Sequence, residues 1–468
     1  MTKIIADYLV KNTFVISMNE ERTCFERGAI AIHGKRIVLV GDEVDVLPKV
    51  RAAKVIDAGG AVTHPGFVDA HVHFMNTARG AFSDVLDTST MMNTLRRWWD
   101  AVEEEDERAA TFLNCLEMLS NGTTCFLEAG TLQFPDASAE AAQAVGIRGF
   151  IGDPFLWDLP AAQGTQDMTR APRDLDRSLN LLGGQLKRNK EDALIKGCVV
   201  LFGLGSASND LMRAAKERAD QSGVIFSQHQ SFDHHDTAVD EERLGSRPMR
   251  HYADCDLIGE NCTFSHMNDL DPDEVGIVQQ AKMSVVWCPV TSMNLGAKAA
   301  RNAKHLEVSR GGGNVALASD GVSSGCRYDV GLQGLMALLS TRAKADSRTT
   351  MTALDVLELA TIGGAKAVGM ERDIGSIEVG KYADIVIRRS DLPEAQPFSD
   401  PIQSLVYNTG SKSIWKVIVN GELVWDEGRP VRVEAGSIYS EAQQSHWRMM
   451  DKLGLTSRYH RRPMPDTK

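Results

Sequence analysis

The sequence predicts an α/β protein in which a (β/α)8 TIM-type barrel is flanked by a small β-sandwich built from both chain ends. Short apolar runs recur between residues 64 and 370, and each is followed by a helical pattern. Eight such units in about 300 residues fit a closed barrel better than an open doubly wound sheet. The sandwich is predicted because strand-like alternation is concentrated in the first part of the chain and in a block near its end.

Both ends of the chain have the alternation of short strands. The stretches "KIIADYLVKN" and "GAIAIHGKRIVLVG" lie near the N-terminus, and "YADIVIRR" and "WKVIVNGELVWDEG" lie near the C-terminus. In the last of these, Asn420–Gly421 indicates a two-residue hairpin. Because the two blocks can pair with each other, we expect residues 1–63 and 371–432 to form the sandwich. Residues 433–468 are expected to form a terminal helix and a tail.

The stretch 64–370 is expected to hold the barrel. Its apolar runs, such as "GTTCFLEAG", "IKGCVVLFGLG" and "MSVVWCPV", are apolar on both faces, as in the buried strands of a parallel sheet. Between them lie helical stretches such as "DERAATFLNCLEMLSNG", where Gly122 stands just past the end as a cap. No GxGxxG or GxxxxGK[ST] pattern follows these runs, which argues against a nucleotide-binding sheet.

Composition argues against several classes of function. The chain has 468 residues, of which 43% are hydrophobic and 24% charged, as in ordinary globular proteins. Its formal net charge of −12 argues against nucleic acid or an anionic membrane as partner, because phosphate binding needs a basic surface. The N-terminus lacks the apolar core of a signal peptide, and the 8 cysteines form no CxxC pairs. We therefore expect a reduced, cytoplasmic protein that acts on a small molecule.

Polar residues stand at the ends of four predicted strands. His71 and His73 end the first, and because residues i and i+2 share one face of a strand, both imidazoles can point to one place. His229 ends the fifth strand, His266 the sixth and Asp320 the eighth. Chemistry in such barrels sits at the C-terminal ends of the strands, so these side chains are expected to meet. Imidazoles and a carboxylate suit Zn2+ and similar metals.

Several motifs in combination resemble the amidohydrolase superfamily. They are "HPGFVDAHVH", "GTT", "SHMNDLDPDEV", "VVWCPVTSMNLG", "VALASDG", "ATIGGAKAVG" and "IGSIEVGKYADIVI". The chain is most similar to the mononuclear branch that holds the triazine hydrolases and the guanine- and adenosine-type deaminases. Phenylurea and thiocarbamate hydrolases are related members of the same superfamily. The resemblance implies the barrel and sandwich, a hydrolytic activity, and a homo-oligomer, dimer or larger.

The resemblance also implies roles for individual residues. It assigns metal ligation to His71, His73, His229 and Asp320. It places His266 near the metal-bound water or the electrophilic oxygen of the substrate. The only lysine of the fourth strand, Lys196, stands at the wrong end to bridge two metals. One divalent metal per chain is therefore expected, Zn2+ first, with Fe2+, Mn2+ and Co2+ as alternatives. Such a metal lowers the pKa of its bound water from about 16 to about 7, and Asp320 is expected to shuttle the proton.

One departure from the family pattern bears on the substrate. Related deaminases and triazine hydrolases carry HxxE on the fifth strand, whose acid protonates a ring nitrogen, whereas this chain has Phe232 there. Because Phe donates no proton, the preferred interpretation is hydrolysis of a small apolar or aromatic amide, urea, carbamate or thiocarbamate, in xenobiotic degradation. The alternatives are a deaminase or chlorohydrolase of a purine, pyrimidine or s-triazine and, more remotely, a barrel that has lost catalysis.

Further site residues are expected around the metal. Glu128 ends the second strand and is a candidate catalytic proton donor, with orientation of a ligand histidine as its alternative role. Asp69, two residues before His71 on the same face, is expected to lie deeper in the barrel as a support. An apolar substrate pocket is also expected, with core packing as the alternative, and its candidate residues are Trp98, Phe155, Trp157 and Phe232.

Overall fold

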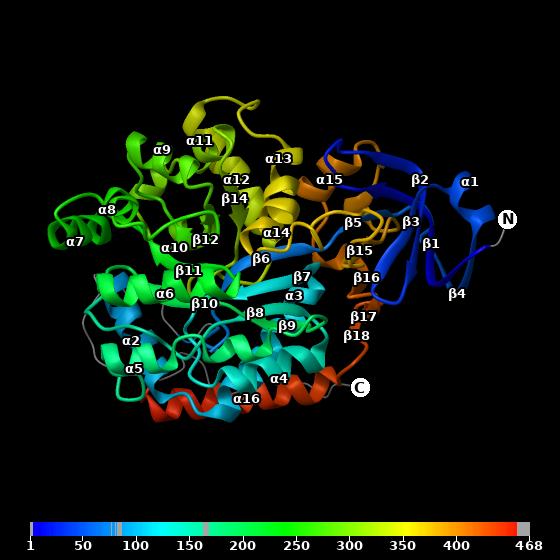
Figure 1. Ribbon diagram of the computed structural model, residues 1–468. Coiled ribbons are helices and arrows are strands. Elements are labelled where there is room, and N and C mark those ends of the chain that lie inside the picture. Colours follow the sequence, from blue (N-terminus) through cyan, green and yellow to red (C-terminus); the bar gives the residue numbers. More distant parts are fainter. Residues whose placement is uncertain (1–2, 76, 80, 82–86, 162–167, 456–468) are drawn as a thin grey trace.

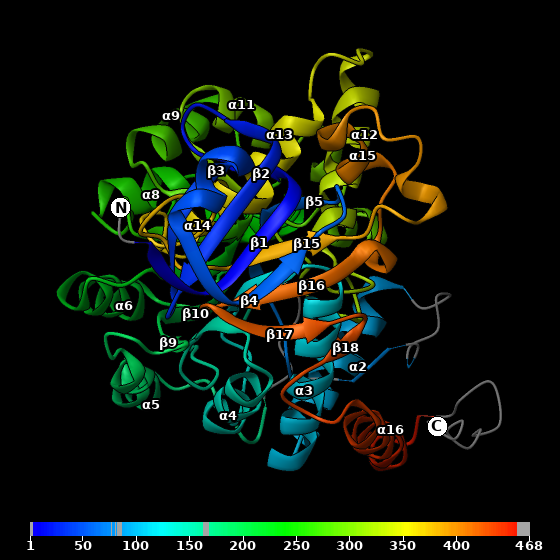
Figure 2. The same cartoon turned by 90° about the vertical axis from the view of Figure 1, so that its right-hand side faces the viewer.

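Three hydrogen-bonded sheets organise the protein, as a computed structural model shows for residues 3–75, 77–79, 81, 87–161 and 168–455 (Figure 1). Two parallel sheets, of four and five strands, hold the middle of the chain. A nine-stranded sheet combines strands from both chain ends. Figure 2 looks onto this mixed sheet, in which the blue N-terminal strands lie beside the orange C-terminal strands.

The two parallel sheets follow one another in chain order. The four-stranded sheet consists of β6 (Phe67–Val72), β7 (Thr123–Glu128), β8 (Arg148–Ile151) and β9 (Ile195–Gly197). The five-stranded sheet consists of β10 (Val199–Gly203), β11 (Phe226–Gln230), β12 (Cys262–His266), β13 (Ser284–Trp287) and β14 (Asn314–Leu317). Nearly all of these strand residues are buried, as expected of strands covered on both faces.

The two sheets meet at both of their ends. Only Cys198 separates β9 from β10. At the other end an isolated parallel bridge joins Val72 to Asp320, and the backbone N–H of Asp320 donates to the carbonyl of His71 over 3.0 Å. The prediction of an α/β fold with a parallel sheet is confirmed, and this strand order is consistent with a TIM-type barrel.

Helices follow most of the parallel strands and surround them (Figure 1). They are α2 (Thr88–Ala101), α3 (Glu104–Ser120), α4 (Pro135–Val145), α5 (Leu175–Leu181), α6 (Asn209–Ser222), α7 (His234–Leu244), α8 (Pro248–Asp254), α9 (Pro272–Gln280), α10 (Pro289–Asn294), α11 (His305–Arg310), α12 (Val330–Ala345), α13 (Ala353–Glu358) and α14 (Gly364–Ala367). The helix expected before Gly122 is α3, which begins at a capping box of Glu103 and Asp106. Gly122 follows it with φ +83°, a conformation that favours glycine.

The nine-stranded sheet joins the two chain ends. Its N-terminal strands are β1 (Ile4–Ile16), β2 (Cys24–His33), β3 (Arg36–Asp42), β4 (Val50–Asp57) and β5 (Val62–Pro65). Its C-terminal strands are β15 (Ile385–Arg388), β16 (Ile414–Val419), β17 (Glu422–Asp426) and β18 (Arg429–Pro430). The antiparallel pair β5–β15 links the two groups. Asn420 and Gly421 form the expected hairpin turn between β16 and β17, both with positive φ.

The mixed sheet is tied to the parallel strands at two places. Gly66 alone separates β5 from β6, and a side chain there would come within 2.0 Å of Thr124. Arg148, at the start of β8, forms a buried ion pair with Asp384, with hydrogen bonds of 2.7 and 3.1 Å. The short link at Gly66 fixes β6, the strand that carries His71, relative to the mixed sheet, and the ion pair does the same for β8.

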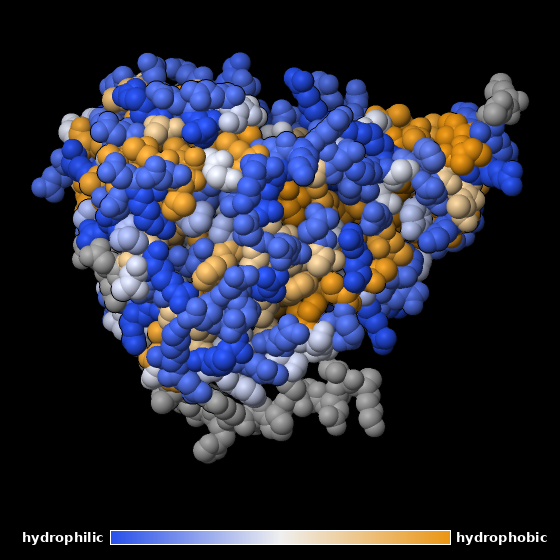
Figure 3. Space-filling view, turned by 60° about the horizontal axis from the view of Figure 1, so that its bottom comes forward, coloured by the Kyte–Doolittle hydropathy of each residue, from blue (hydrophilic) through white to orange (hydrophobic). Residues whose placement is uncertain are grey.

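The C-terminal helix α16 (Ala435–Lys452) packs along α3 (Figures 1 and 2). Ser445 and Arg448 on α16 both hydrogen-bond the carboxylate of Asp106 on α3. Among the described helices, none is long and apolar enough to cross a membrane. Figure 3 shows a mainly hydrophilic face on which hydrophobic residues gather near the N-terminal strands, and the exposed apolar side chains of β1 and β4 include Ile5 and Val55.

Candidate metal centre

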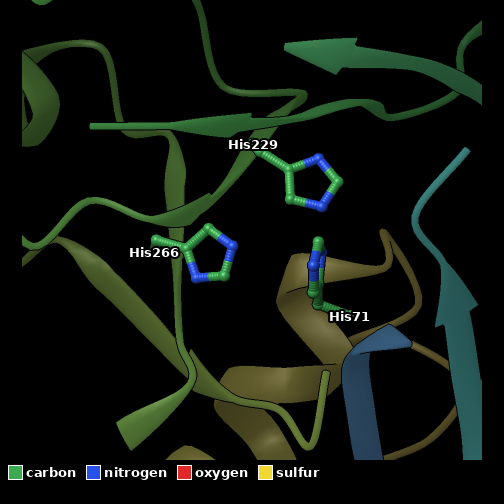
Figure 4. A group of neighbouring side chains, drawn as sticks. All are labelled: His71, His229 and His266. Carbon is green, nitrogen blue, oxygen red and sulfur yellow. The ribbon is translucent and has the colours of Figure 1, made fainter. Parts of the chain in front are cut away.

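The structure brings together the four histidines and the aspartate expected at the strand ends. His71 lies on β6, His73 directly follows that strand, and His229 lies on β11. His266 is the last residue of β12, and Asp320 follows β14. All five are at least nine-tenths buried. Figure 4 shows the rings of His71, His229 and His266 turned toward a common space.

The ligand-type atoms lie within the distances of a single-metal site. Nε2 of His73 is 3.2 Å from Nε2 of His229 and 3.3 Å from Oδ1 of Asp320. Nε2 of His266 is 4.0 Å from Oδ2 of Asp320. Three triads each have donor atoms within 4.8 Å of one another and could hold an ion. They are His71, His229 and His266; His71, His73 and Asp320; and His266, Cys288 and Asp320.

The outer ring nitrogen of each of three histidines is held by a hydrogen bond. The pairs are His71 Nδ1 with the Ser265 hydroxyl (2.6 Å), His73 Nδ1 with the Thr131 hydroxyl (2.8 Å) and His229 Nδ1 with the Phe202 carbonyl (2.6 Å). A carbonyl only accepts, so Nδ1 of His229 carries the proton and its Nε2 is a free lone pair. The same tautomer follows for His73, because the Thr131 hydroxyl donates to Glu128. Such outer bonds orient metal-ligating histidines.

The Nε2 atoms of His71, His73 and His229, which face the centre of the cluster, are placed to bind a cation. The Nε2 lone pairs of His73 and His229 face each other over 3.2 Å, which is repulsive without a proton or a positive ion between them. Nε2 of His71 is buried and has no hydrogen-bond partner among the described residues. Orphaned buried polar atoms are rare and call for an explanation such as an ion. The donor set of imidazoles and one carboxylate therefore fits a divalent metal.

Burial sets the charge of this cluster. It lowers the pKa of both His71 and His229 well below the usual value, and the neighbouring imidazoles add to this effect. Burial acts to raise the pKa of Asp320, but the close contact with His73 and the proximity of His266 and His71 bring it well below its ordinary value. Neutral His71 and His229 beside an ionised Asp320 are in the protonation states that a metal requires.

Two of the residues stand on a strained backbone. His266 has φ +72° and Asp320 has φ +64°, values that L-residues rarely adopt. The carbonyl of His266 accepts a 2.6 Å hydrogen bond from Nε2 of His305, whose ring lies flat against Trp287. The Asp320 carboxylate accepts from the N–H of Gly321 over 2.7 Å. These bonds hold the side chains of His266 and Asp320 toward the cluster.

Glu128 and Asp69 lie behind the cluster. Glu128 is fully buried and accepts hydrogen bonds from the Thr131 hydroxyl (2.9 Å) and the N–H of Gly130 (2.8 Å). It therefore contacts His73 only through Thr131, the geometry of a residue that orients a ligand. Asp69 accepts from the N–H of Ser319 over 2.8 Å, and burial raises its pKa to about 7.

A small cavity opens beside the cluster. Its volume is about 50 Å3, well below the roughly 300–1,000 Å3 of most small-molecule pockets. Among the described residues that line it, Asp320 is the sole carboxylate. The ring of Phe232 stands edge-on to His266, with the two centroids 5.0 Å apart. The apolar wall includes Leu95, Trp99, Phe202, Leu204, Phe232 and Leu295.

Of the four aromatic residues expected in the pocket, the structure places only Phe232 in the cavity wall. Trp98 packs in an apolar cluster with Met449 and Met450 of α16. Phe155 and Trp157 lie in the core behind Trp99 and Phe202, which line the cavity instead. Trp98 and Trp99 are adjacent on α2, where neighbouring residues point about 100° apart, and the sequence does not say which of the two faces inward.

Sequence reasoning also missed Ser265, Thr131 and His305, which hold His71, His73 and the His266 backbone. Ser265 directly precedes His266, and because adjacent strand residues point to opposite faces, the strand period gave no signal for it. Thr131 and His305 carry no local pattern, because their partners lie far away in sequence.

Comparisons with known proteins agree with this geometry. The 5-methylthioadenosine/S-adenosylhomocysteine deaminase of Syntrophobacter fumaroxidans is 30% identical over 429 residues, covering 91% of this chain and 94% of that protein. An adenosine deaminase from Xanthomonas campestris, solved with bound zinc, has a TM-score of 0.88 at 24% identity, covering 96% of this chain and all of that one. The zinc complex of the atrazine chlorohydrolase TrzN from Arthrobacter aurescens has a TM-score of 0.84 at 20% identity, over 94% and 100% of the two chains.

The chain also matches the description of a whole family. The Amidohydrolase family profile matches residues 62–424, which spans the parallel sheets and most of the C-terminal strands of the mixed sheet. The predicted resemblance is confirmed, and the chain is an enzyme of the amidohydrolase family.

Proposed function

We propose that the chain is a metal-dependent aminohydrolase that removes an amino group from a nitrogen heterocycle. Metal-dependent hydrolysis is supported by one observation: four imidazoles and Asp320 lie together, and some of their buried ring nitrogens have no hydrogen-bond partner among the described residues. The heterocycle is supported by a relative of nearly the same length that is named a deaminase. The comparisons thus favour this alternative over the amide, urea or carbamate hydrolase that we preferred from the sequence.

The chain's own residues have separate roles in this proposal. His71, His73, His229 and Asp320 would hold the metal, which supplies a water activated for attack near neutral pH. Asp320, ionised and hydrogen-bonded to Gly321, would accept a proton and return it to the leaving amino group. His266 would stabilise the oxygen that becomes negative during attack. Glu128 would orient His73 through Thr131.

We take zinc as the metal. The two solved structures described above carry zinc in their names, and imidazole with carboxylate suits it. Iron, manganese and cobalt in their divalent states accept the same ligands and stay alternatives.

The finer description of the architecture is likewise a proposal. The bridge between Val72 and Asp320 and the continuity through Cys198 support a closed (β/α)8 barrel over 64–370. The strands of 1–63 and 371–432 would form the β-sandwich, and 433–468 the terminal helix and tail, whose residues 456–468 lie outside the described part. A homo-oligomer, a cytoplasmic location and a role in xenobiotic degradation stay predictions.

A second candidate function is favoured by Phe232. This residue lies in the cavity wall against His266, at the position where related deaminases carry the acid that protonates a ring nitrogen. The cavity of about 50 Å3 also admits a compact reacting group more easily than a nucleoside. Both observations favour an open amide, urea, carbamate or thiocarbamate as the substrate.

Ammonia release separates the two candidates. The metal-loaded enzyme would be incubated with 5′-modified adenosines, aminopyrimidines and aminotriazines, and with aryl ureas and carbamates, with products identified by mass. The proposal expects ammonia and a hydroxylated heterocycle, and a loss of at least about a thousandfold in kcat for Asp320→Asn. Amine release from ureas without any ammonia would favour the second candidate. No turnover in either group would support the remote alternative, a non-catalytic barrel.

A further inference from the structure

A second cavity lies beside the candidate metal centre and shares none of its histidines. Its volume is about 640 Å3, within the range typical of small-molecule sites. It is bounded by α10, the short helix η3 (Ala299–Asn302), α11 and the end of α12. Thr291 and Leu295 line the small reaction cavity, whereas Ser292 and Gly296 line this one. The same short segment therefore separates the two cavities, which we call the reaction cavity and the side cavity.

The side cavity has an apolar wall with one fixed aromatic ring. Trp287 lines it, and its ring is stacked on that of His305, with centroids 4.6 Å apart and planes within 6°. His305 is in turn held by its bond to the His266 carbonyl. Met293 and Leu306 add aliphatic surface. A flat apolar group of a ligand can therefore pack on a ring that does not need to be ordered first.

The rim of the side cavity is cationic. Arg301, Arg310 and Lys344 line it, and Glu307 is the only carboxylate among its described lining residues. That carboxylate is already paired with Lys304 at 3.0 Å. Arg301, Arg310 and Lys344 form no ion pair within the part of the chain that the structure describes, and in a chain with net charge −12 such a group of cations favours an anionic partner.

The hydrogen bonds of these cations leave their charge uncompensated. Arg310 donates to the carbonyl of Thr350, and Lys344 donates to the carbonyl of Ala303 over 3.1 Å. Carbonyl oxygens satisfy donors without neutralising them. Burial lowers the pKa of Lys344 and the neighbouring Lys304 lowers it further, while Glu307 acts in the opposite direction without reversing the shift. An anion in the side cavity would relieve this repulsion.

We infer that the side cavity is a binding site for a small amphipathic anion, an aromatic carboxylate whose ring packs on Trp287 and whose carboxylate pairs with Arg301 and Arg310. Guanidinium groups favour carboxylates because two N–H donors match two oxygens. The volume accommodates one or two fused rings with an acid group. This site is additional to the proposed aminohydrolase reaction and does not depend on it.

Calorimetric titration of the full-length protein tests the inference. The probe is 2-naphthoate, and its neutral isostere 2-naphthamide measures the contribution of charge. We expect one naphthoate per chain, with the amide weaker by about tenfold or more, the usual effect of losing a charged hydrogen bond. The variant Arg301→Gln/Arg310→Gln should lose a similar factor. The matched control Arg213→Gln/Arg218→Gln, on the exposed side of α6, should bind as the unmodified protein does.

Two further variants separate this site from the metal centre. Ala300→Trp should abolish naphthoate binding by filling the side cavity without changing its charge. Asp320→Ala should leave naphthoate binding unchanged, although it disrupts the metal centre, where a carboxylate could also coordinate. Binding that disappears in Asp320→Ala and persists in the arginine variant would overturn the inference. Equal affinity for the acid and the amide, or no binding up to about 1 mM naphthoate, would do the same.

Discussion

At the scale of single residues, two ring nitrogens of the imidazole cluster repel each other unless a cation lies between them. Nε2 of His73 and Nε2 of His229 both carry lone pairs, since Thr131 and the Phe202 carbonyl take the protons on their outer nitrogens. The contact of these two lone pairs at 3.2 Å is therefore unfavourable when neither ring is protonated and no cation is bound. Metal affinity and the orientation of these rings are two consequences of the same hydrogen bonds.

Removing an inner nitrogen should remove the metal. We expect His71→Ala and His229→Ala to reduce bound zinc from about one per chain to well below that level, because each loses one of few protein ligands. Metal content of purified protein, measured by mass spectrometry, checks this. His251→Ala, a surface histidine on α8 bonded to Asn209, is the control and should retain full metal. Full zinc in His71→Ala would contradict the assigned ligand set.

Phe232 offers a test of the missing acid. Phe232→Glu should raise ammonia release from aminoheterocycles by about a hundredfold, the usual size of general-acid catalysis. The site is apolar and beside the ionised Asp320, so the new carboxyl would stay protonated near neutral pH and could donate. Steady-state rates measure the change. Phe232→Gln has the same size without the proton, and equal rates for the two variants would argue against a need for this acid.

At the scale of elements, ion pairs at one point link α16 to the junction of α2 and α3. Glu103 pairs with Arg170 and, at 2.8 Å, with Lys452 at the end of α16. These contacts lower the pKa of Glu103 to about 2, the hydrogen bond from Arg170 having the largest effect and that from Lys452 the next. The apolar cluster of Trp98, Met449 and Met450 packs the same helix from the inside.

The stabilisation by Glu103 should disappear in acid. Its pKa is lowered in the folded state, so the contribution is full above the ordinary value of 4.5 and is lost as the pH falls toward about 2. Glu103→Gln should speed amide exchange of residues 435–452 by about two- to fivefold near pH 6, the size typical of an exposed ion pair. Hydrogen exchange with mass spectrometry measures this. The difference from the unmodified chain should shrink as the pH approaches 3, and a constant difference would exclude the ion pairs as its cause.

At the scale of the whole molecule, a buried ion pair joins the mixed sheet to the parallel strands. Arg148 of β8 and Asp384 before β15 have side chains only 3% and 2% exposed. The same carboxylate accepts from the N–H of Asn420 at the β16–β17 turn, and the Tyr382 ring lies beneath the guanidinium of Arg148. A buried pair of this kind adds little net stability, but breaking it leaves an uncompensated charge.

Arg148→Met should therefore destabilise the protein by about 3–5 kcal/mol. Denaturant-induced unfolding followed by circular dichroism gives the free energy. Adding Asp384→Asn should recover part of the loss, since the lone charge is then gone. The exposed pair of Arg389 and Asp391 provides the control, and Arg389→Met should cost less than about 1 kcal/mol. Equal effects of the buried and exposed substitutions would contradict this account.

Much of the fold could be predicted from the sequence, because local pattern and strand period carry it. The parallel strands, α3 with its glycine cap and the Asn420–Gly421 turn follow from runs, caps and turn residues that act over short distances. The meeting of His71, His73, His229, His266 and Asp320 was predictable because the carboxyl ends of neighbouring parallel strands lie on one side. The cavity wall was not, since the choice between Trp98 and Trp99 depends on how α2 is rotated against distant residues of α16 and β10.

The short link at Gly66 has a consequence for how the chain is made. β6, which carries His71, continues directly from β5. β5 pairs with β1 on one side and on the other with β15, which begins at Ile385. During synthesis the N-terminal part emerges first. The edge of β5 that pairs with β15 therefore stays unpaired while the parallel strands are being synthesised. The pairing of β5 with β15 therefore forms only after all strands that carry the candidate ligands have been made, and a chain that ends before β15 would carry the histidines without this pairing.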